Sequence, residues 1–136
     1  MRRKVKTAFF IERLKLFLFF YIYFLEKVNL MRESNFQADL KKELKRIFPG
    51  CIITKLDSGD IQGIPDLLIL YKNKWATLEC KKSKNESKRP NQEYYVRLMN
   101  EMSFSRFIYP ENKEEVIDEL QQTFRSRRPT CFSGSK

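Results

Sequence analysis

Two carboxylates and a lysine lie at the ends of apolar runs in the segment GIPDLLILYKNKWATLECKK, residues 63–82. Asp66 opens the first run, Glu79 lies near the end of the second, and Lys81 follows two residues later. Acidic side chains at the margin of a core are unfavourable unless a positive group sits between them. The segment therefore raises the question of whether these three side chains form one site.

The spacing of the two runs predicts a β-hairpin that brings the side chains together. A two-residue turn at Lys72 and Asn73 places Asp66 directly opposite Glu79 on one face of the sheet, and asparagine tolerates the left-handed conformation that such a turn requires. A four-residue loop keeps this arrangement, whereas a three-residue loop moves Glu79 to the other face. Lys81 follows Glu79 on the same face because side chains alternate along a strand.

Two adjacent carboxylates of this kind favour a hard divalent cation with oxygen ligands, such as Mg²⁺. A lysine beside such an ion can orient a water molecule and stabilise charge that develops on a phosphate. The combination indicates metal-assisted hydrolysis of a phosphodiester. On spacing alone the alternative stays open that Asp66 only follows a proline turn, while Glu79 and Lys81 belong to a solvated strand face.

Composition excludes several other chemistries. The 136 residues contain no histidine, which removes Ser/His/Asp and Cys/His catalysis and imidazole metal sites. The three cysteines, Cys51, Cys80 and Cys131, form no CxxC motif, which favours a reducing, cytosol-like compartment over a zinc cage or a disulfide framework. Most of the net charge of +10 lies outside the middle of the chain, where residues 32–124 hold sixteen basic against fifteen acidic residues.

Hydrophobic spacing predicts an α/β domain with elements in the order α-β-β-β-α-β-α. Strands are expected at residues 51–57, 66–71, 74–81 and 104–109. Helices are expected over 36–48, from Pro90 onward and after Pro110. The helix that starts at Pro90 is expected to bury a stripe formed by Tyr95, Leu98, Met99 and Met102.

Residues 1–30 differ from the rest of the chain, because a basic start, MRRKVK, precedes the aromatic stretch AFFIERLKLFLFFYIYFL. Its uncharged core, Leu16–Leu25, falls short of the roughly 20 residues that a membrane-spanning helix needs, so a membrane partner is not expected. Three interpretations stay open. The segment is an upstream, poorly ordered or dispensable extension of the reading frame, an extra helix packed on the domain, or a segment with a membrane role. We therefore expect an extension at 1–30, a folded domain at 31–124 and a basic, disordered tail at 125–136.

The central motifs resemble those of the PD-(D/E)XK nuclease superfamily. Pro65-Asp66 matches the PD element, and Glu79-Cys80-Lys81 matches the ExK element. More narrowly, the chain is similar from about Met31 to Pro110 to the small stand-alone VRR-NUC type, which includes phage and viral endonucleases. Two further elements match in order: a helix opening of the form E-x-x-x-Q over residues 33–37, and a glutamine, Gln92, on the second helix after RPN.

The resemblance implies a restriction-endonuclease-like core, with a four-stranded mixed sheet flanked by helices. It implies Mg²⁺ or Mn²⁺ held by Asp66, Glu79 and the backbone carbonyl of Cys80, with Lys81 at the attacking water and Glu33 completing the acidic cluster. A competing local interpretation is that residues 34–37 form a capping box, which leaves Glu33 just outside the helix. Gln92 either supports the site, contacts DNA or serves as a helix-start amide.

The loop after the ExK element carries a local basic patch. Its side chains are expected to contact DNA phosphates, although a solvated loop would have the same composition; they are Lys82, Lys84, Lys88 and Arg89. Nothing among them predicts base readout, and selectivity for branched, flapped or junction DNA, like that of a Holliday junction resolvase, is what the resemblance suggests.

We therefore expect a cytoplasmic, metal-dependent DNA endonuclease, located in the host cytoplasm if a phage encodes it. A compact enzyme cuts two strands only by pairing, so a homodimer is expected. Two alternatives remain: a DNA-binding module of the same fold that has lost cleavage, and a membrane-associated phage protein led by residues 8–25.

Overall fold

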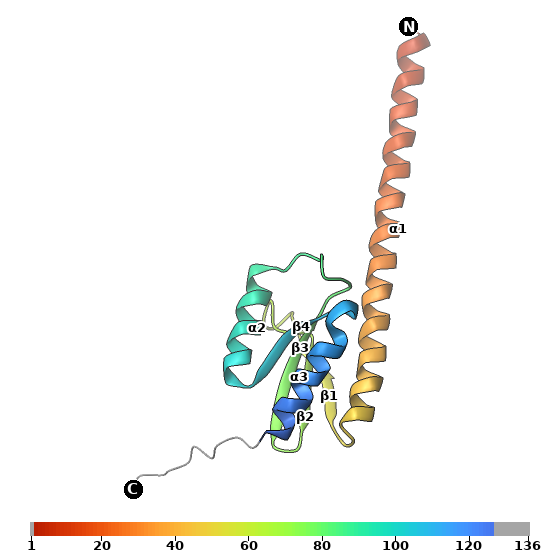
Figure 1. Ribbon diagram of the computed structural model, residues 1–136. Helices are drawn as coiled ribbons and strands as arrows, with labels where there is room; N and C mark the ends of the chain where they lie inside the picture. The colour runs from red at the N-terminus through yellow and green to blue at the C-terminus, as the bar shows by residue number, and fades with distance from the viewer. Residues whose placement is uncertain (1, 127–136) are drawn as a thin grey trace. The chain divides into compact units, whose positions relative to one another are not determined.

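The computed structural model describes residues 2–126, and it describes side chains for residues 11–28 and 31–126 (Figure 1). The chain divides into two compact units, Met1–Asn35 and Phe36–Lys136. The second unit contains the sheet and its covering helices. The predicted disordered tail falls, apart from residues 125 and 126, outside the part of the chain that is described.

The first helix, α1 (Arg2–Ile47), is much longer than the hydrophobic spacing predicts. It runs through residues 34–37 without interruption, so the capping box proposed there is wrong, because a capping box requires Ser34 to precede the first turn. The helix ends where Phe48 donates its backbone N–H to the carbonyl of Leu44 at 2.8 Å, followed by Gly50 with φ of +81°. No helix of residues 2–126 has an apolar stretch long enough to span a bilayer.

Four strands form one mixed sheet, as predicted, and their spatial order is β1-β2-β3-β4. They are β1 (Ile52–Lys55), β2 (Leu67–Tyr71), β3 (Lys74–Cys80) and β4 (Phe104–Ile108). The first three strands pair antiparallel, and β3 pairs with β4 in parallel. This arrangement confirms the predicted α/β class and the order of the elements.

The β2–β3 hairpin has the predicted register, in which Leu67 pairs with Leu78 and Tyr71 pairs with Lys74. The two-residue turn is therefore correct, but the left-handed residue is Lys72, with φ of +56°, rather than Asn73. A positive φ at the first central position, without one at the second, is characteristic of a type II′ turn. The register matters because it fixes which side chains beyond the strand ends face each other.

The two faces of the sheet are covered by different helices. On one face, α3 (Lys113–Arg125) and the part of α1 after Asn35 enclose the apolar core, with the short 3₁₀ helix η1 (Pro110–Asn112) leading into α3. The core side chains include Leu40, Leu44, Leu67, Ile69, Leu78, Ile108 and Leu120. On the other face lies α2 (Pro90–Met102), which forms the crossover between the parallel strands β3 and β4.

The face under α2 is more polar than the sequence predicts. Thr77 and Ser105 are fully buried there, and their hydroxyl groups are 2.8 Å apart. Val96 is the buried residue of α2, whereas Met102 is 58% exposed, so the predicted apolar stripe is wrong at its C-terminal end. The reason is that α2 packs on a row of small polar side chains. This face of the sheet therefore presents a narrower apolar surface to α2 than the core face presents to α1 and α3.

The loop between β1 and β2 packs tightly against the start of α2. Gly63 has φ of +91°, and a Cβ atom placed on it would lie 2.6 Å from Cβ of Asn91 and 2.7 Å from the carbonyl carbon of the same residue. Real Cβ contacts of this length do not occur, so only glycine fits. Gly50 has a similar φ of +81°, but no heavy atom lies within 4 Å of the corresponding position.

We predict that Gly63→Ala destabilises the protein much more than Gly50→Ala does. Both substitutions impose a left-handed conformation on alanine, which costs about 1–2 kcal/mol. Only the substitution at Gly63 adds a backbone clash, so its total cost is expected to reach about 3 kcal/mol or more. Thermal or urea unfolding of both variants measures the difference, and equal losses of stability would contradict the close approach described at Asn91.

Candidate active site

One cleft in the second unit brings together the acids that the sequence singles out. Asp66 lies directly before β2, and Glu79 is the last residue but one of β3. Both side chains line a cleft of about 480 Å³. Its other walls come from the loop before β2 and the first turn of α2, namely Ser58, Gln62, Gly63, Ile64, Arg89, Pro90, Asn91 and Gln92.

Asp66 is held by the neighbouring strand. Its Oδ2 atom accepts the backbone N–H of Cys80 at 2.8 Å, and its own carbonyl accepts the N–H of Leu56 at 2.9 Å. Burial raises the pKa of the Asp66 carboxyl group, while the hydrogen bond from Cys80 and the charge of Lys81 act in the opposite direction. The carboxylate is therefore fixed at the cleft in a position where its negative charge is poorly solvated.

Glu79 is buried more deeply, with 2% of its surface exposed. Its Oε1 atom accepts a hydrogen bond from Nε2 of Gln92 and lies 3.6 Å from Nζ of Lys81. The Oε2 atom is buried and has no hydrogen-bond partner. Burial, followed by the charge of Asp66, raises the pKa of Glu79 from the ordinary 4.5 to about 7, although Lys81 opposes this shift.

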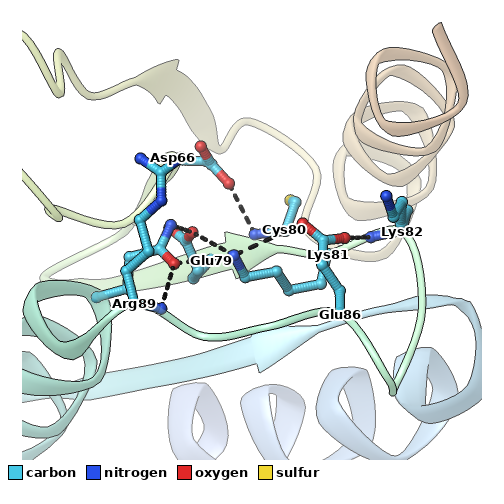
Figure 2. A network of polar contacts seen from close by, with 8 residues as sticks. Asp66, Glu79, Cys80, Lys81, Lys82, Glu86 and Arg89 are labelled. Carbon is cyan, nitrogen blue, oxygen red and sulfur yellow. Dashed lines mark hydrogen bonds and ion pairs between the residues drawn. The ribbon is translucent and has the colours of Figure 1, made fainter. Parts of the chain in front are cut away.

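Lys81 stands at the centre of a polar network on this face of the sheet, which Figure 2 shows. The residue is 6% exposed, and its Nζ atom donates to Oε1 of Gln92 at 2.9 Å. A second carboxylate, that of Glu86, lies 3.8 Å from the same nitrogen. Gln92 also accepts the backbone N–H of Arg89 at 3.1 Å, so one amide both caps the start of α2 and joins Glu79 to Lys81.

Glu86 belongs to the site but was missed by the sequence analysis. Its Oε1 atom faces Lys81, while Oε2 accepts the backbone N–H of Lys82 at 2.8 Å. Figure 2 shows this side chain folded back from the loop toward the end of β3. The available signal was that Glu86 is the one acid among five basic residues in the segment 81–89. The direction of its side chain depends on the loop conformation, which residue spacing does not define.

The predicted phosphate-binding residues are all exposed: Lys82, Lys84, Lys88 and Arg89. Two of them have additional contacts. Nζ of Lys88 lies 4.6 Å from the ring centre of Phe107 on β4, and Arg89 lines the cleft. Ser58 and Gln62, on the opposite wall, were not singled out from the sequence because the polar loop 57–63 carries no motif.

The residues of the predicted E-x-x-x-Q element lie on α1. Glu33 belongs to the first unit, and its role as a metal ligand stays a prediction. Gln37 belongs to the second unit, where it is 6% exposed and its Oε1 atom has no hydrogen-bond partner. The role of the Cys80 carbonyl as a ligand also stays a prediction; the N–H group of the same residue binds Asp66.

A solved structure described as "VRR_NUC domain" is similar to this chain, with a TM-score of 0.53 and 21% sequence identity. The match covers 66% of this chain and 95% of the other. The chain has the fold of a VRR-NUC domain. No family model matches the sequence, and no curated protein matches it. The fold expected from the PD and ExK elements is therefore confirmed, while the roles of the VRR-NUC motif residues stay predictions.

The VRR-NUC fold raises the question of a divalent metal, and the donor set in the cleft fits one. Two carboxylates with raised pKa values face the cleft, and one of them has a buried oxygen without a partner. Within residues 2–126 no group of three or more acidic, cysteine or histidine side chains forms a metal cluster. Mg²⁺ does not require one, because it is commonly held by one or two carboxylates while waters and phosphate oxygens complete its coordination.

The raised pKa of Glu79 predicts an unusual pH dependence of stability in the metal-free protein. Between about pH 4.5 and pH 7 the folded state binds more protons than the unfolded state, so stability falls as pH rises through this range. The shift corresponds to a loss of up to about 3 kcal/mol. Glu79→Gln removes the titrating group, and we expect it to flatten this part of the profile.

Urea unfolding in EDTA, between about pH 5 and about pH 8, measures this difference. Glu93→Gln is the matched control, because Glu93 is an exposed acid in the first turn of α2. Profiles of equal slope in Glu79→Gln and the wild-type protein would show that Glu79 does not carry the effect.

Proposed function

We propose that this protein is a metal-dependent endonuclease that hydrolyses phosphodiester bonds of DNA. One observation carries the proposal: the buried Oε2 atom of Glu79 lacks a partner in a cleft that it shares with a second poorly solvated carboxylate, Asp66. A buried, unpaired acid oxygen is costly unless a ligand satisfies it. The VRR-NUC fold supports the same function, since the solved structure of that name is a nuclease domain by its description.

Asp66 and Glu79 would hold Mg²⁺ or Mn²⁺, together with the backbone carbonyl of Cys80, and Glu33 is a further proposed ligand. When bound, the cation would neutralise negative charge on the scissile phosphate and on the departing 3′ oxygen. The two carboxylates are already fixed, one by the N–H of Cys80 and the other by Gln92. The protein therefore holds its ligands in place without a large rearrangement, which is the arrangement that fast chemistry requires.

Lys81 would orient the attacking water and stabilise negative charge on the phosphate. Its ammonium group is buried, so its charge acts in surroundings that screen it weakly. Gln92 positions this group through the 2.9 Å hydrogen bond and positions Glu79 through the other end of the same amide. One glutamine thus fixes the relative placement of an acid and a cation, which makes Gln92 a positioning residue in this proposal.

The substrate backbone would enter the cleft from the side of the basic loop. Arg89 is exposed at the cleft and lies directly before α2, whose N-terminal end is favourable for a phosphate group. Lys82, Lys84 and Lys88 are exposed in the loop before Arg89 and would add positive charge for the substrate backbone. These contacts read the backbone rather than the bases, which supports selection by DNA structure, such as branched, flapped or four-way DNA. Cleavage of two strands would then require a homodimer.

The test is a cleavage assay with Mg²⁺, Mn²⁺ or EDTA on linear, flapped, forked and four-way DNA. We expect nicking with either metal and none with EDTA. Asp66→Asn, Glu79→Gln and Lys81→Ala are each expected to lower the single-turnover rate by about a hundredfold or more. Glu93→Gln, the exposed control on α2, should retain the wild-type rate.

Two outcomes would contradict the proposal. A folded variant at Asp66, Glu79 or Lys81 that keeps the full rate would refute the role assigned to that residue. Absence of cleavage of every substrate, combined with metal-independent DNA binding, would identify instead the alternative of a DNA-binding module without catalysis. Equal rates on all four DNA forms would refute only the selectivity for structured DNA.

Glu86 offers a separate prediction, because its charge opposes DNA binding while it helps to hold Lys81. Glu86→Gln keeps an oxygen that can accept the N–H of Lys82, so the loop is expected to retain its conformation. We expect DNA affinity at low salt to rise about threefold, since one negative charge leaves the basic loop. The cleavage rate at saturating DNA is expected to fall, because Lys81 loses one of its two carboxylate neighbours. A rate that rises together with affinity would contradict this positioning role.

A further inference from the structure

The first unit contains a helix segment whose apolar side chains face solvent on every side. All ten side chains of Leu16–Leu25 are apolar or aromatic, and each is between 42% and 73% exposed. Successive residues of an α-helix point about 100° apart, so four consecutive ones, such as 16–19, already point in four directions. An apolar surface of this extent marks an interaction site rather than an ordinary protein surface.

The distribution of these side chains distinguishes among the surfaces that could cover them. A protein partner that contacts one side of the helix, including a second copy of this chain in a coiled coil, matches an apolar stripe with polar residues elsewhere. Leu16–Leu25 has no polar side, because Phe17 and Phe24 lie opposite Phe19 and Ile22. A helix that is apolar all round is buried either in the core of a large protein or in lipid, and lipid chains cover every side of it at once.

The charges at the ends of the segment complement an anionic lipid surface. Arg13 and Lys15 precede it together with one acid, Glu12, and the sequence before them contains MRRKVK, so the basic excess lies on the N-terminal side; Glu26 and Lys27 follow it. The side chains of Lys15 and Lys27 are exposed, and long basic side chains beside apolar surface place their charged ends at the headgroup level. Charged groups at both ends of a segment only ten residues long, with the basic excess at its N-terminal side, fit a helix that lies along a membrane, because neither end needs to reach the bilayer centre.

We propose that residues 11–28 of α1 bind an anionic lipid bilayer, with the helix lying in the plane of one leaflet. A helix with its side chains is about 10–12 Å across, which fits within the roughly 15 Å of hydrocarbon in one leaflet. Its backbone hydrogen bonds are made within the helix, so no backbone group is left unsatisfied in lipid. This association does not depend on the proposed nuclease activity, because it uses residues of the first unit alone.

The test is flotation of the full-length protein with vesicles of phosphatidylcholine, with and without phosphatidylglycerol. We expect binding to both, stronger with phosphatidylglycerol, and weakened but not abolished by high salt. Two double variants, Phe17→Gln with Phe24→Gln and Phe19→Gln with Ile22→Gln, alter opposite sides of the helix. Each is expected to weaken binding by at least about tenfold, because lipid contacts both sides.

Lys15→Gln tests the electrostatic part, with Lys42→Gln as a matched control. Each lysine is exposed on α1 and pairs with an acid three residues earlier, Glu12 at 3.3 Å and Asp39 at 3.5 Å. Only Lys15→Gln should lower binding to phosphatidylglycerol vesicles. Circular dichroism of every variant checks that the helix is retained.

Three results would overturn the proposal. The first is absence of flotation with either kind of vesicle. The second is binding that survives both double variants, which would assign it to the basic loop of the second unit. The third is a result in which only one of the two double variants loses vesicle binding, and the same variant disrupts oligomers that light scattering detects without lipid. This result would identify a protein contact on one side of the helix.

Discussion

The site depends on an unfavourable electrostatic interaction between two carboxylates that the β2–β3 hairpin holds at the edge of the core. Each acid is poorly solvated, and the charge of Asp66 adds to the burial that raises the pKa of Glu79. The interaction cannot relax by sliding the strands, because the register that places the acids together also places Leu67 and Leu78 in the core. Apolar packing therefore stabilises an arrangement that electrostatics alone would disfavour.

The parallel pairing of β3 and β4 determines what compensates this repulsion. A parallel neighbour requires a crossover, and the crossover helix α2 starts at the same edge of the sheet where β3 ends. Gln92, in the first turn of α2, therefore reaches both Glu79 and Lys81. The backbone N–H of Lys81 binds the carbonyl of Ile108 at 2.8 Å, which continues the β3–β4 ladder past the last residue of β3 and fixes the lysine.

Much of the fold followed from local patterns. The hairpin register could be predicted from the lengths of the two apolar runs. With a two-residue turn between them, Tyr71 pairs with Lys74, and this pairing places both carboxylates on the same face. The polar row of Thr77 and Ser105 beneath α2 could not be predicted from the apolar stripe of that helix. Helix periodicity shows which side of a helix is apolar, but not which residues lie on the surface that the helix covers. The start of α1 was missed because the prediction relied on a change in composition after residue 30. Residues 1–30 contain no glycine or proline, so nothing in them interrupts a helix.

Loop conformations account for the parts of the site that spacing did not reveal. Glu86 reaches Lys81 because its loop folds back, and Ser58 and Gln62 reach the cleft because their loop lies against α2. The acids and the lysine could be singled out because their spacing in the hairpin and their match to the PD and ExK elements point to the same three residues. Side chains that reach the site only because a loop has a particular conformation have no comparable sequence pattern.

The close approach of Gly63 to Asn91 has a consequence for how the cleft accommodates a ligand. These residues lie on opposite walls, and their backbones are already in contact at a distance that excludes even a methyl group. The walls therefore cannot draw nearer to each other at that point. The width of the cleft at that point is therefore set by a backbone contact within the protein itself.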